Sequence, residues 1–167
     1  MFRFEDLDAI TRRWMLEEFE KEYSSANPYY GKALTAAGRQ AYVIEMRRAI
    51  QDPNGNEVML TMALSLPSYW TEHPESNTQR LAITEFNTWY VRGLCRRLIE
   101  ENIEECEVYR AGSAEEPRAE CTSWEGRRFK VTQVYNGHRA RYWPRPNPGI
   151  FSVPAGANCH HSIRRIR

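Results

Sequence analysis

The feature that most constrains this chain is a stripe of apolar residues that recur every four positions. Its members are Ala82, Phe86, Tyr90, Leu94 and Leu98. An α-helix makes one turn in 3.6 residues, so this spacing keeps the side chains on one face, which Trp89 widens. The pattern predicts a long helix, capped by Asn77 or Thr78 and ending near Asn102, that other elements must cover.

Three shorter helices are predicted ahead of it. The expected ranges are about 8–23, 35–50 and 58–66. Asp6 or Asp8 can cap the first and Thr35 the second, because short polar side chains accept hydrogen bonds from free N–H groups at helix starts. Pro67 ends the third. The expected apolar faces consist of Leu7, Ile10 and Trp14, then Val43, Met46 and Ile50, then Val58, Met59, Met62, Ala63 and Leu66.

The sequence changes character after Glu105. Cys106–Arg110 and Arg128–Tyr135 have the composition or the alternation of strands, and Ile150–Val153 is a third, shorter candidate. Asn136-Gly137 is a turn pair, and residues 111–119 are expected to form a loop. We therefore expect an α+β protein with a helical domain over 1–104 and a small β-rich Cys/His module over 105–167.

Charge is divided unequally between these two segments. Residues 1–109 hold 12 Lys and Arg against 18 Asp and Glu, a net charge of −6, whereas residues 110–167 hold 11 against 4, a net charge of +7. Such a division favours either a basic surface for nucleic acid or an acidic partner, or two segments that attract each other.

Neither a signal peptide nor an apolar run of membrane-spanning length is visible in the sequence. We therefore expect no membrane partner and a reducing cytoplasm. The four cysteines are then expected to be thiols or metal ligands instead of disulfides.

Cysteine and histidine gather late in the chain. Zinc takes about four nitrogen or sulfur ligands, and the candidates are Cys121, Cys159, His161, His138 and Cys106. Their spacing matches no standard zinc motif, so the alternative is a set of buried thiols beside histidines that hydrogen-bond the backbone. No catalytic residue is assigned, although Cys159 with His138, or a metal-dependent nuclease using His138, Asn158 and His161, is an enzymatic alternative.

Arginines alternate with aromatic residues over the same region. Those that could contact DNA phosphates or an acidic partner are Arg127, Arg128, Arg139, Arg141, Arg164 and Arg165. A solvated face would have the same composition. A DNA-binding accessory protein is therefore a further alternative.

Two segments of this region together resemble a known family. Arg118-Ala119-Glu120-Cys121-Thr122-Ser123-Trp124-Glu125-Gly126 and the later Gly156-Ala157-Asn158-Cys159-His160-His161-Ser162 are similar to the C-terminal module of tailed-phage minor capsid and head morphogenesis proteins. In that family the module pairs Trp-x-Gly with a closing Asn-Cys-x-His. The matching positions are Cys121, Trp124, Gly126, Asn158, Cys159 and His161. His160 stands where the family usually has arginine.

The resemblance implies a phage virion structural protein: a minor capsid, head morphogenesis or head–tail connector component. It would bind portal or major capsid protein within an oligomeric assembly, and it would occur in the virion and in the host cytoplasm during assembly. The cysteines and histidines near the motif would be metal ligands, as the resemblance to Mu-type members of the family implies.

Overall fold

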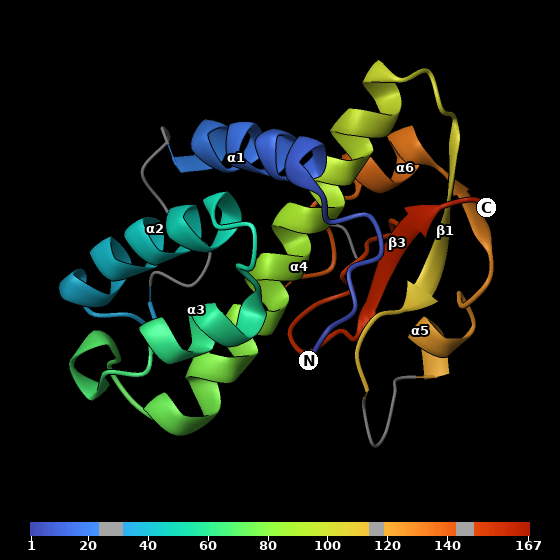
Figure 1. The fold of residues 1–167 in the computed structure, drawn as a ribbon. Helices are drawn as coiled ribbons and strands as arrows, with labels where there is room; N and C mark the ends of the chain where they lie inside the picture. The colour runs from blue at the N-terminus through green and yellow to red at the C-terminus, as the bar shows by residue number, and fades with distance from the viewer. Residues whose placement is uncertain (24–31, 114–118, 143–148) are drawn as a thin grey trace.

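The computed structural model describes residues 1–23, 32–113, 119–142 and 149–167. The helices are α1 (Ala9–Tyr23), α2 (Ala36–Gln51), α3 (Glu57–Ala63), the 3-10 turn η1 (Pro67–Tyr69), α4 (Pro74–Glu100), α5 (Ala119–Thr122) and α6 (Val131–Asn136), and the strands are β1 (Glu105–Arg110), β2 (Arg128–Lys130) and β3 (His161–Arg165). This confirms the α+β class, with a helical N-terminal half and a small sheet in the C-terminal part (Figure 1).

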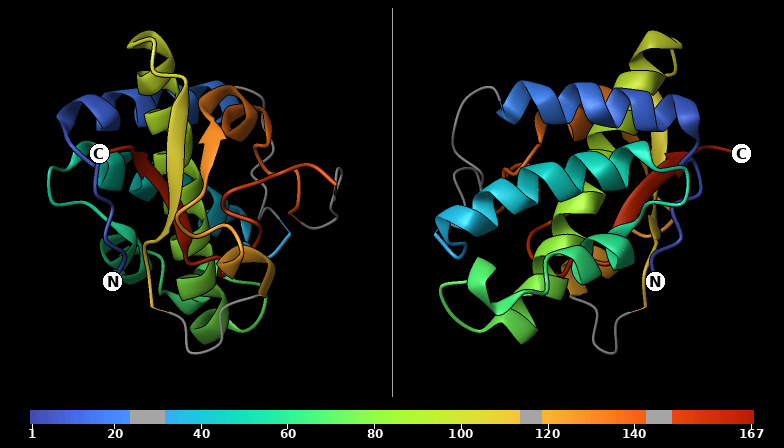
Figure 2. Two further views of the ribbon diagram at one scale, coloured as in Figure 1. Left: turned by 90° about the vertical axis from the view of Figure 1, so that its right-hand side faces the viewer. Right: turned by 60° about the vertical axis from the view of Figure 1, so that its left-hand side comes forward.

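Helix α4 runs through the middle of the molecule. Helices α1, α2 and α3 lie on one side of it, and the sheet with α6 lies on the other (Figures 1 and 2). The predicted stripe from Ala82 to Leu98 is buried, and Trp89 is fully buried beside it. Burial extends around the helix to polar residues such as Thr84 and Asn87, because α4 is covered by elements on both sides.

The start of α4 differs from the prediction. The helix begins at Pro74. Proline suits the first turn because its fixed φ is helical and because an N–H group at this position would have no acceptor within the helix. The two predicted capping residues lie within the helix and do not cap it. The Thr78 hydroxyl donates to the Pro74 carbonyl, and the Asn77 side-chain amide donates to the Glu72 carbonyl.

The caps of the first two helices are confirmed. Asp8 Oδ1 accepts hydrogen bonds from the backbone N–H groups of Ile10 and Thr11, and Thr35 accepts one from Gly38. The expected face of α1 is wrong, however. Ile10 is 48% exposed, and α1 packs on α4 through the face that carries Met15 and Phe19.

A three-stranded antiparallel sheet has the order β2-β1-β3. β1 is where the sequence predicted it, but β3 was not predicted, and Ile150–Val153 forms no strand. The predicted strand 128–135 ends at Lys130. Val131 N–H donates to the Glu104 carbonyl, just before β1 begins, so β1 offers no further pairing, and the chain turns into α6. Val131 and Val134, three apart, are then both buried.

The two predicted segments share one hydrophobic core. One cluster of buried side chains includes Phe19 and Met46 from the helical half together with Val108, Val134 and Ile163 from the C-terminal part. The division at residue 104 therefore separates two kinds of local structure that pack against each other.

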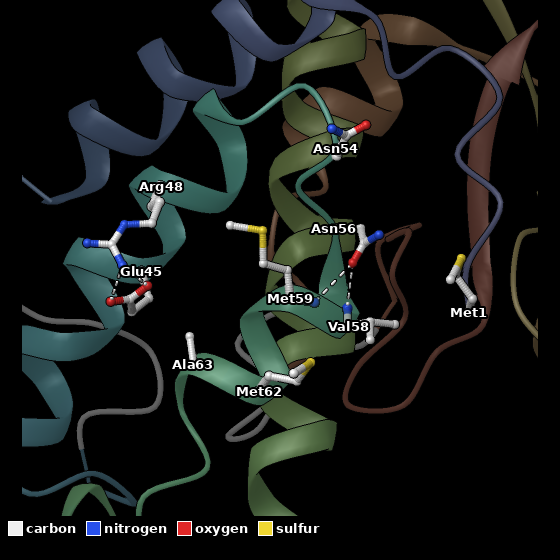
Figure 3. A pocket seen from close by; sticks show the side chains of 9 residues that line it. All are labelled: Met1, Glu45, Arg48, Asn54, Asn56, Val58, Met59, Met62 and Ala63. Atoms are coloured by element: carbon white, nitrogen blue, oxygen red, sulfur yellow. Dashed lines mark hydrogen bonds and ion pairs between the residues drawn. The ribbon is translucent and has the colours of Figure 1, made fainter.

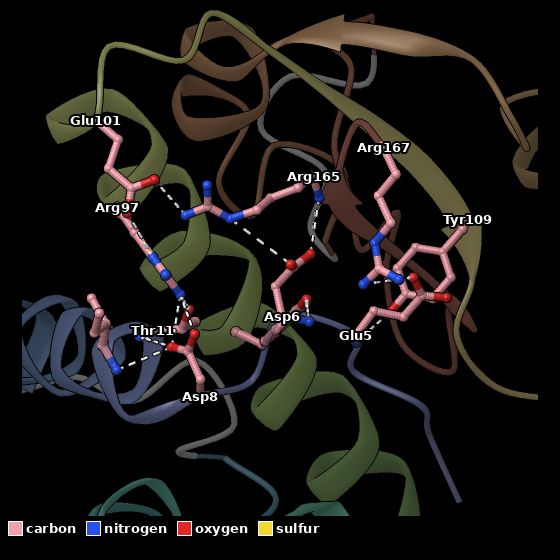
Figure 4. A network of polar contacts seen from close by, with 11 residues as sticks. Glu5, Asp6, Asp8, Thr11, Arg97, Glu101, Tyr109, Arg165 and Arg167 are labelled. Atoms are coloured by element: carbon pink, nitrogen blue, oxygen red, sulfur yellow. Dashed lines mark hydrogen bonds and ion pairs between the residues drawn. The ribbon is translucent and has the colours of Figure 1, made fainter.

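Ion pairs connect the acidic N-terminal segment with the basic C-terminal segment. Arg164 lies 3.0 Å from Glu5. Arg165 pairs with Glu101, and its backbone N–H donates to Asp6 (Figure 4). Arg139 pairs with both Glu22 and Glu85. Of the two alternatives left open by the charge division, mutual attraction of the segments is thus realised at these arginines.

Residues 24–31, between the first two predicted helices, and most of the loop expected at 111–119 lie outside the described residues.

Gly93 provides a test of the α1–α4 packing. A Cβ at Gly93 would lie 2.5 Å from Met15 Cγ and 2.6 Å from Met15 N, whereas a Cβ at Gly149 would contact nothing within 4 Å. Gly93→Ala should lower the free energy of unfolding by about 1–3 kcal/mol, as overpacking does, and Gly149→Ala should leave it nearly unchanged. Chemical denaturation measures both. Equal stability of the two variants would contradict the close α1–α4 contact.

Candidate metal centre

Three of the predicted ligands meet in the C-terminal part. Cys121, Cys159 and His161 each offer a ligand atom, and these atoms all lie within 4.8 Å of one another. All three residues are buried, with exposed fractions of 2%, 3% and 1%. Zinc bonds of about 2.3 Å to sulfur and about 2.0 Å to nitrogen place tetrahedral ligands roughly 3.5 Å apart. A contraction of about 1 Å would therefore suffice, and the group could hold a metal ion.

Cys121 is positioned by α5 and by the Trp-x-Gly segment after it. The backbone N–H of Trp124 donates to the Cys121 carbonyl, and Gly126 N–H donates to Val108 in β1. Gly126 has a φ of +75°, in the region that favours glycine. Trp124 packs edge-on against Phe151, with ring centroids 4.8 Å apart. The motif therefore ties the short helix to the sheet.

Cys159 and His161 are positioned by α4. The segment turns at Asn158, whose φ is +60°, a conformation that asparagine tolerates better than most residues. Thr84 accepts a hydrogen bond from the Asn158 N–H at 3.1 Å, and Asn87 donates to the His161 carbonyl at 2.8 Å. The buried polar residues of the long helix thus fix the loop that carries two of the three candidate ligands.

Glu125 orients the histidine. His161 Nε2 lies 2.6 Å from Glu125 Oε1, and Arg110 pairs with the same carboxylate. With Nε2 occupied by Glu125, Nδ1 is the nitrogen left to bind a metal. A carboxylate on the second nitrogen of a metal-binding histidine is a recurring arrangement, which fixes the ring and its tautomer. The sequence prediction missed Glu125 and Arg110, because neither has a recognisable spacing to His161.

The Cys121 thiol is uncharged in the absence of a metal. A hydrogen bond with Cys159, together with burial, raises the pKa of Cys121 well above its usual range. Although burial opposes it, the contacts of His161 with Cys121 and Glu125 raise the pKa of that imidazole. Metal binding would therefore release protons, as it does wherever thiolates and neutral imidazole are the ligands.

Two other predicted ligands lie elsewhere. His138 Nε2 lies 2.9 Å from Glu22, and its ring packs near Trp89. Cys106 faces the Phe129 carbonyl, and burial raises its pKa to about 12. Neither belongs to the three-residue cluster, so the structure does not bring these two predicted ligands together with the other three. His138 is paired with Glu22 on α1, and the three-residue cluster that contains Cys159 and His161 does not include it.

The six predicted contact arginines divide into two groups. Four of them form ion pairs within the chain. Arg139 pairs with Glu22 and Glu85, and Arg141 pairs with Glu120. Arg164 pairs with Glu5 and Glu107, and Arg165 pairs with Asp6 and Glu101. Arg127, just before β2, and Arg128, its first residue, are exposed. Arg139 is a structural residue because it is buried among its acidic partners.

An open groove of about 560 Å³ lies along α3 and the neighbouring part of α2 (Figure 3). Methionines line much of it, including Met59 and the 74% exposed Met62. Its polar groups are engaged locally: Arg48 pairs with Glu45, and Asn56 caps α3. The described residues that line the groove therefore present a largely apolar surface, and its two charged residues, Glu45 and Arg48, pair with each other.

Comparison with protein-family models, with curated proteins and with solved structures gave no significant match. Among the described residues, no helix combines the length and hydropathy that crossing a membrane requires.

The His138–Glu22 pair predicts an acid-sensitive stability. Burial lowers the pKa of His138 from 6.5 to about 4, outweighing its hydrogen bond with Glu22. The unfolded chain then takes up a proton below about pH 6.5 that the folded chain refuses, so stability is lost as the pH falls from 6.5 towards 4. Between pH 7 and 4.5 we expect this loss to be about 2 kcal/mol.

His138→Gln removes the group that titrates, so its unfolding free energy should not show this loss. As the pH falls from 7 to 4.5, wild type should lose about 2 kcal/mol of stability relative to the variant. His73→Gln, at a histidine with a 76% exposed side chain, is the control. The measurements stay above pH 4.5, because Glu22 also affects the pH dependence of stability below it. Although burial opposes it, contacts with His138 and Arg139 lower the pKa of Glu22 to about 2. Parallel pH profiles of wild type and His138→Gln would contradict a neutral His138.

Proposed function

We propose that Cys121, Cys159 and His161 form a structural zinc site that locks the C-terminal segment against α4 and the sheet. The convergence of the three ligand atoms within 4.8 Å carries this proposal. Two cysteines and one histidine are ligands that zinc favours. The site joins a four-residue helix to the turn before a five-residue strand, two elements too short to be stable alone.

Burial supports a structural role over a catalytic one. A catalytic zinc keeps one of its four positions open to water or substrate. The three residues here leave one position for a further ligand, but all three are at most 3% exposed, which keeps that position away from bulk solvent. Glu125 is engaged by His161 and Arg110, so it orients a ligand and is not free to act as an acid or base. The function that fits this arrangement is binding of another macromolecule by a metal-stabilised fold.

We further propose that the partner is a phage head protein, and that the chain is a minor capsid, head morphogenesis or connector component of the virion. The support is the resemblance of the Trp-x-Gly and Asn-Cys-x-His segments, which lie apart in sequence and come together at the candidate site. The motif positions have structural roles that fit this resemblance. Gly126 and Asn158 provide the two positive-φ turns, and Cys121, Cys159 and His161 provide the ligands.

Zinc content tests the first proposal. The chain purified with zinc in the medium should hold about one zinc per molecule by elemental analysis, and Cys159→Ser should lose it, because a serine hydroxyl is a poor zinc ligand. Cys106→Ser is the matched control, since Cys106 is also buried but lies outside the cluster. Its zinc content should equal that of wild type.

Loss of zinc should also lower the melting temperature, because metal that binds only the folded chain stabilises it. Wild-type protein without metal under these conditions, or equal zinc in wild type and Cys159→Ser, would contradict the zinc site.

The second proposal predicts that the chain is incorporated into phage particles. Mass spectrometry of purified virions should detect it, and a deletion of its gene should reduce the yield of DNA-filled heads. Complementation with the wild-type gene should restore that yield, and complementation with the Cys159→Ser gene should not. A normal yield of infectious particles that lack this chain would contradict a role in the virion.

A further inference from the structure

The open groove of about 560 Å³ lies apart from the candidate zinc site and has a largely apolar lining. Val58, Met59, Met62 and Ala63 line it from α3 (Figure 3). Val58 and Met62 are 39% and 74% exposed, so the groove leaves large apolar side chains in contact with water. When such side chains gather on one surface of a soluble protein, that surface commonly binds a partner.

Exposed apolar side chains are concentrated on this face. Seven large ones occur among the described residues, and Met1, Val58 and Met62 of this set line the groove. A fourth, Ile44, lies on α2 one helical turn before Arg48, which also lines the groove. The groove is therefore the surface of the described chain that gains most from being covered.

The helix that lines the groove also carries a ridge of the kind that fills one. Val58 and Met62 are four residues apart, so their side chains follow one another along the same face of α3. Methionine is unbranched and flexible, so Met59 and Met62 can adapt to a neighbouring side chain. A two-fold axis brings the same patch of two copies together. A patch that holds both a ridge and a groove can therefore bind a second copy of itself.

The charges of this patch also suit a second copy. Its two charged side chains have opposite signs, and Arg48 lies 3.0 Å from Glu45. A two-fold axis reverses the direction of α2, so Arg48 of one copy can face Glu45 of the other without bringing like charges together. The exposed Arg127 and Arg128 beside each other would instead meet the same two cations of a second copy.

We propose that this chain forms a dimer in which α3 of one copy packs antiparallel on α3 of the other across a two-fold axis. Met62 of each copy then contacts Val58 of its partner. A seven-residue helix and one turn of α2 make a small interface, so the dimer is weak and reversible. The proposal is independent of the zinc site and of the phage partner.

Sedimentation equilibrium of the full chain, with zinc and a reducing agent present, tests the dimer. As the protein concentration rises from about 1 to 300 µM, the average mass should rise from 19.6 kDa towards twice that value. A mass of 19.6 kDa at every concentration would overturn the proposal and leave the groove to a different protein. So would a mass that exceeds two copies, because a two-fold interface closes at the dimer.

Met62→Glu locates the interface. It places a charge in the apolar contact twice in each dimer, so the dissociation constant should rise by about ten-fold or more. The exposure of Met62 lets the variant keep its fold, which circular dichroism and the melting temperature verify. Ile150→Glu is the matched control, because Ile150 is 44% exposed and precedes Phe151, which stacks on Phe129 in β2. It should dimerise like wild type, and equal dimerisation of folded Met62→Glu would overturn the proposal.

Mixing two variants tests the antiparallel arrangement. Val58→Lys should weaken the dimer as Met62→Glu does, because it also places a charge against an apolar side chain in each contact. In an equal mixture, the new lysine of one variant faces the new glutamate of the other, and the second contact keeps Met62 against Val58. The mixture should therefore form a one-to-one dimer at concentrations where each variant alone is monomeric. A mixture that stays monomeric would overturn the proposal.

Discussion

The burial of α4 on opposite sides is the constraint on which the rest of the structure depends. One side packs against α1, α2 and α3, and the other supports the sheet and α6. A helix covered in this way must satisfy the polar groups that it buries. Thr84 and Asn87 do so by hydrogen bonds to the segment that carries Cys159 and His161. The geometry of the candidate zinc site therefore depends on how α4 is packed.

Charge complementarity secures the same arrangement from outside the core. Arg139 reaches Glu22 on α1 and Glu85 on α4, and Arg164 and Arg165 reach the acidic N-terminal segment. Breaking such a pair where it is buried costs more than the pair contributes, because one charge is left without a partner. The division of charge along the sequence thus contributes to joining the two segments, and only Arg127 and Arg128 among the predicted contact arginines are exposed.

Local patterns in the sequence predicted the helices well. The stripe on α4 and the caps at Asp8 and Thr35 depend on neighbours within one or two turns, so they can be recognised without a structure. β3 could not be predicted, because His161 and Ser162 are polar residues that become buried only through long-range packing. The helix at Val131–Asn136 was mistaken for a strand for the same reason, since the end of β1 decides where pairing stops.

The site was predictable in part. Composition identified Cys121, Cys159 and His161, but distance along the chain could not separate them from His138 and Cys106, which the fold sends to other partners. Zinc K-edge X-ray absorption of the metal-loaded chain would identify the ligands of the proposed zinc site. We expect two sulfur ligands at about 2.3 Å and nitrogen or oxygen ligands at about 2.0 Å. A first shell without sulfur would contradict it.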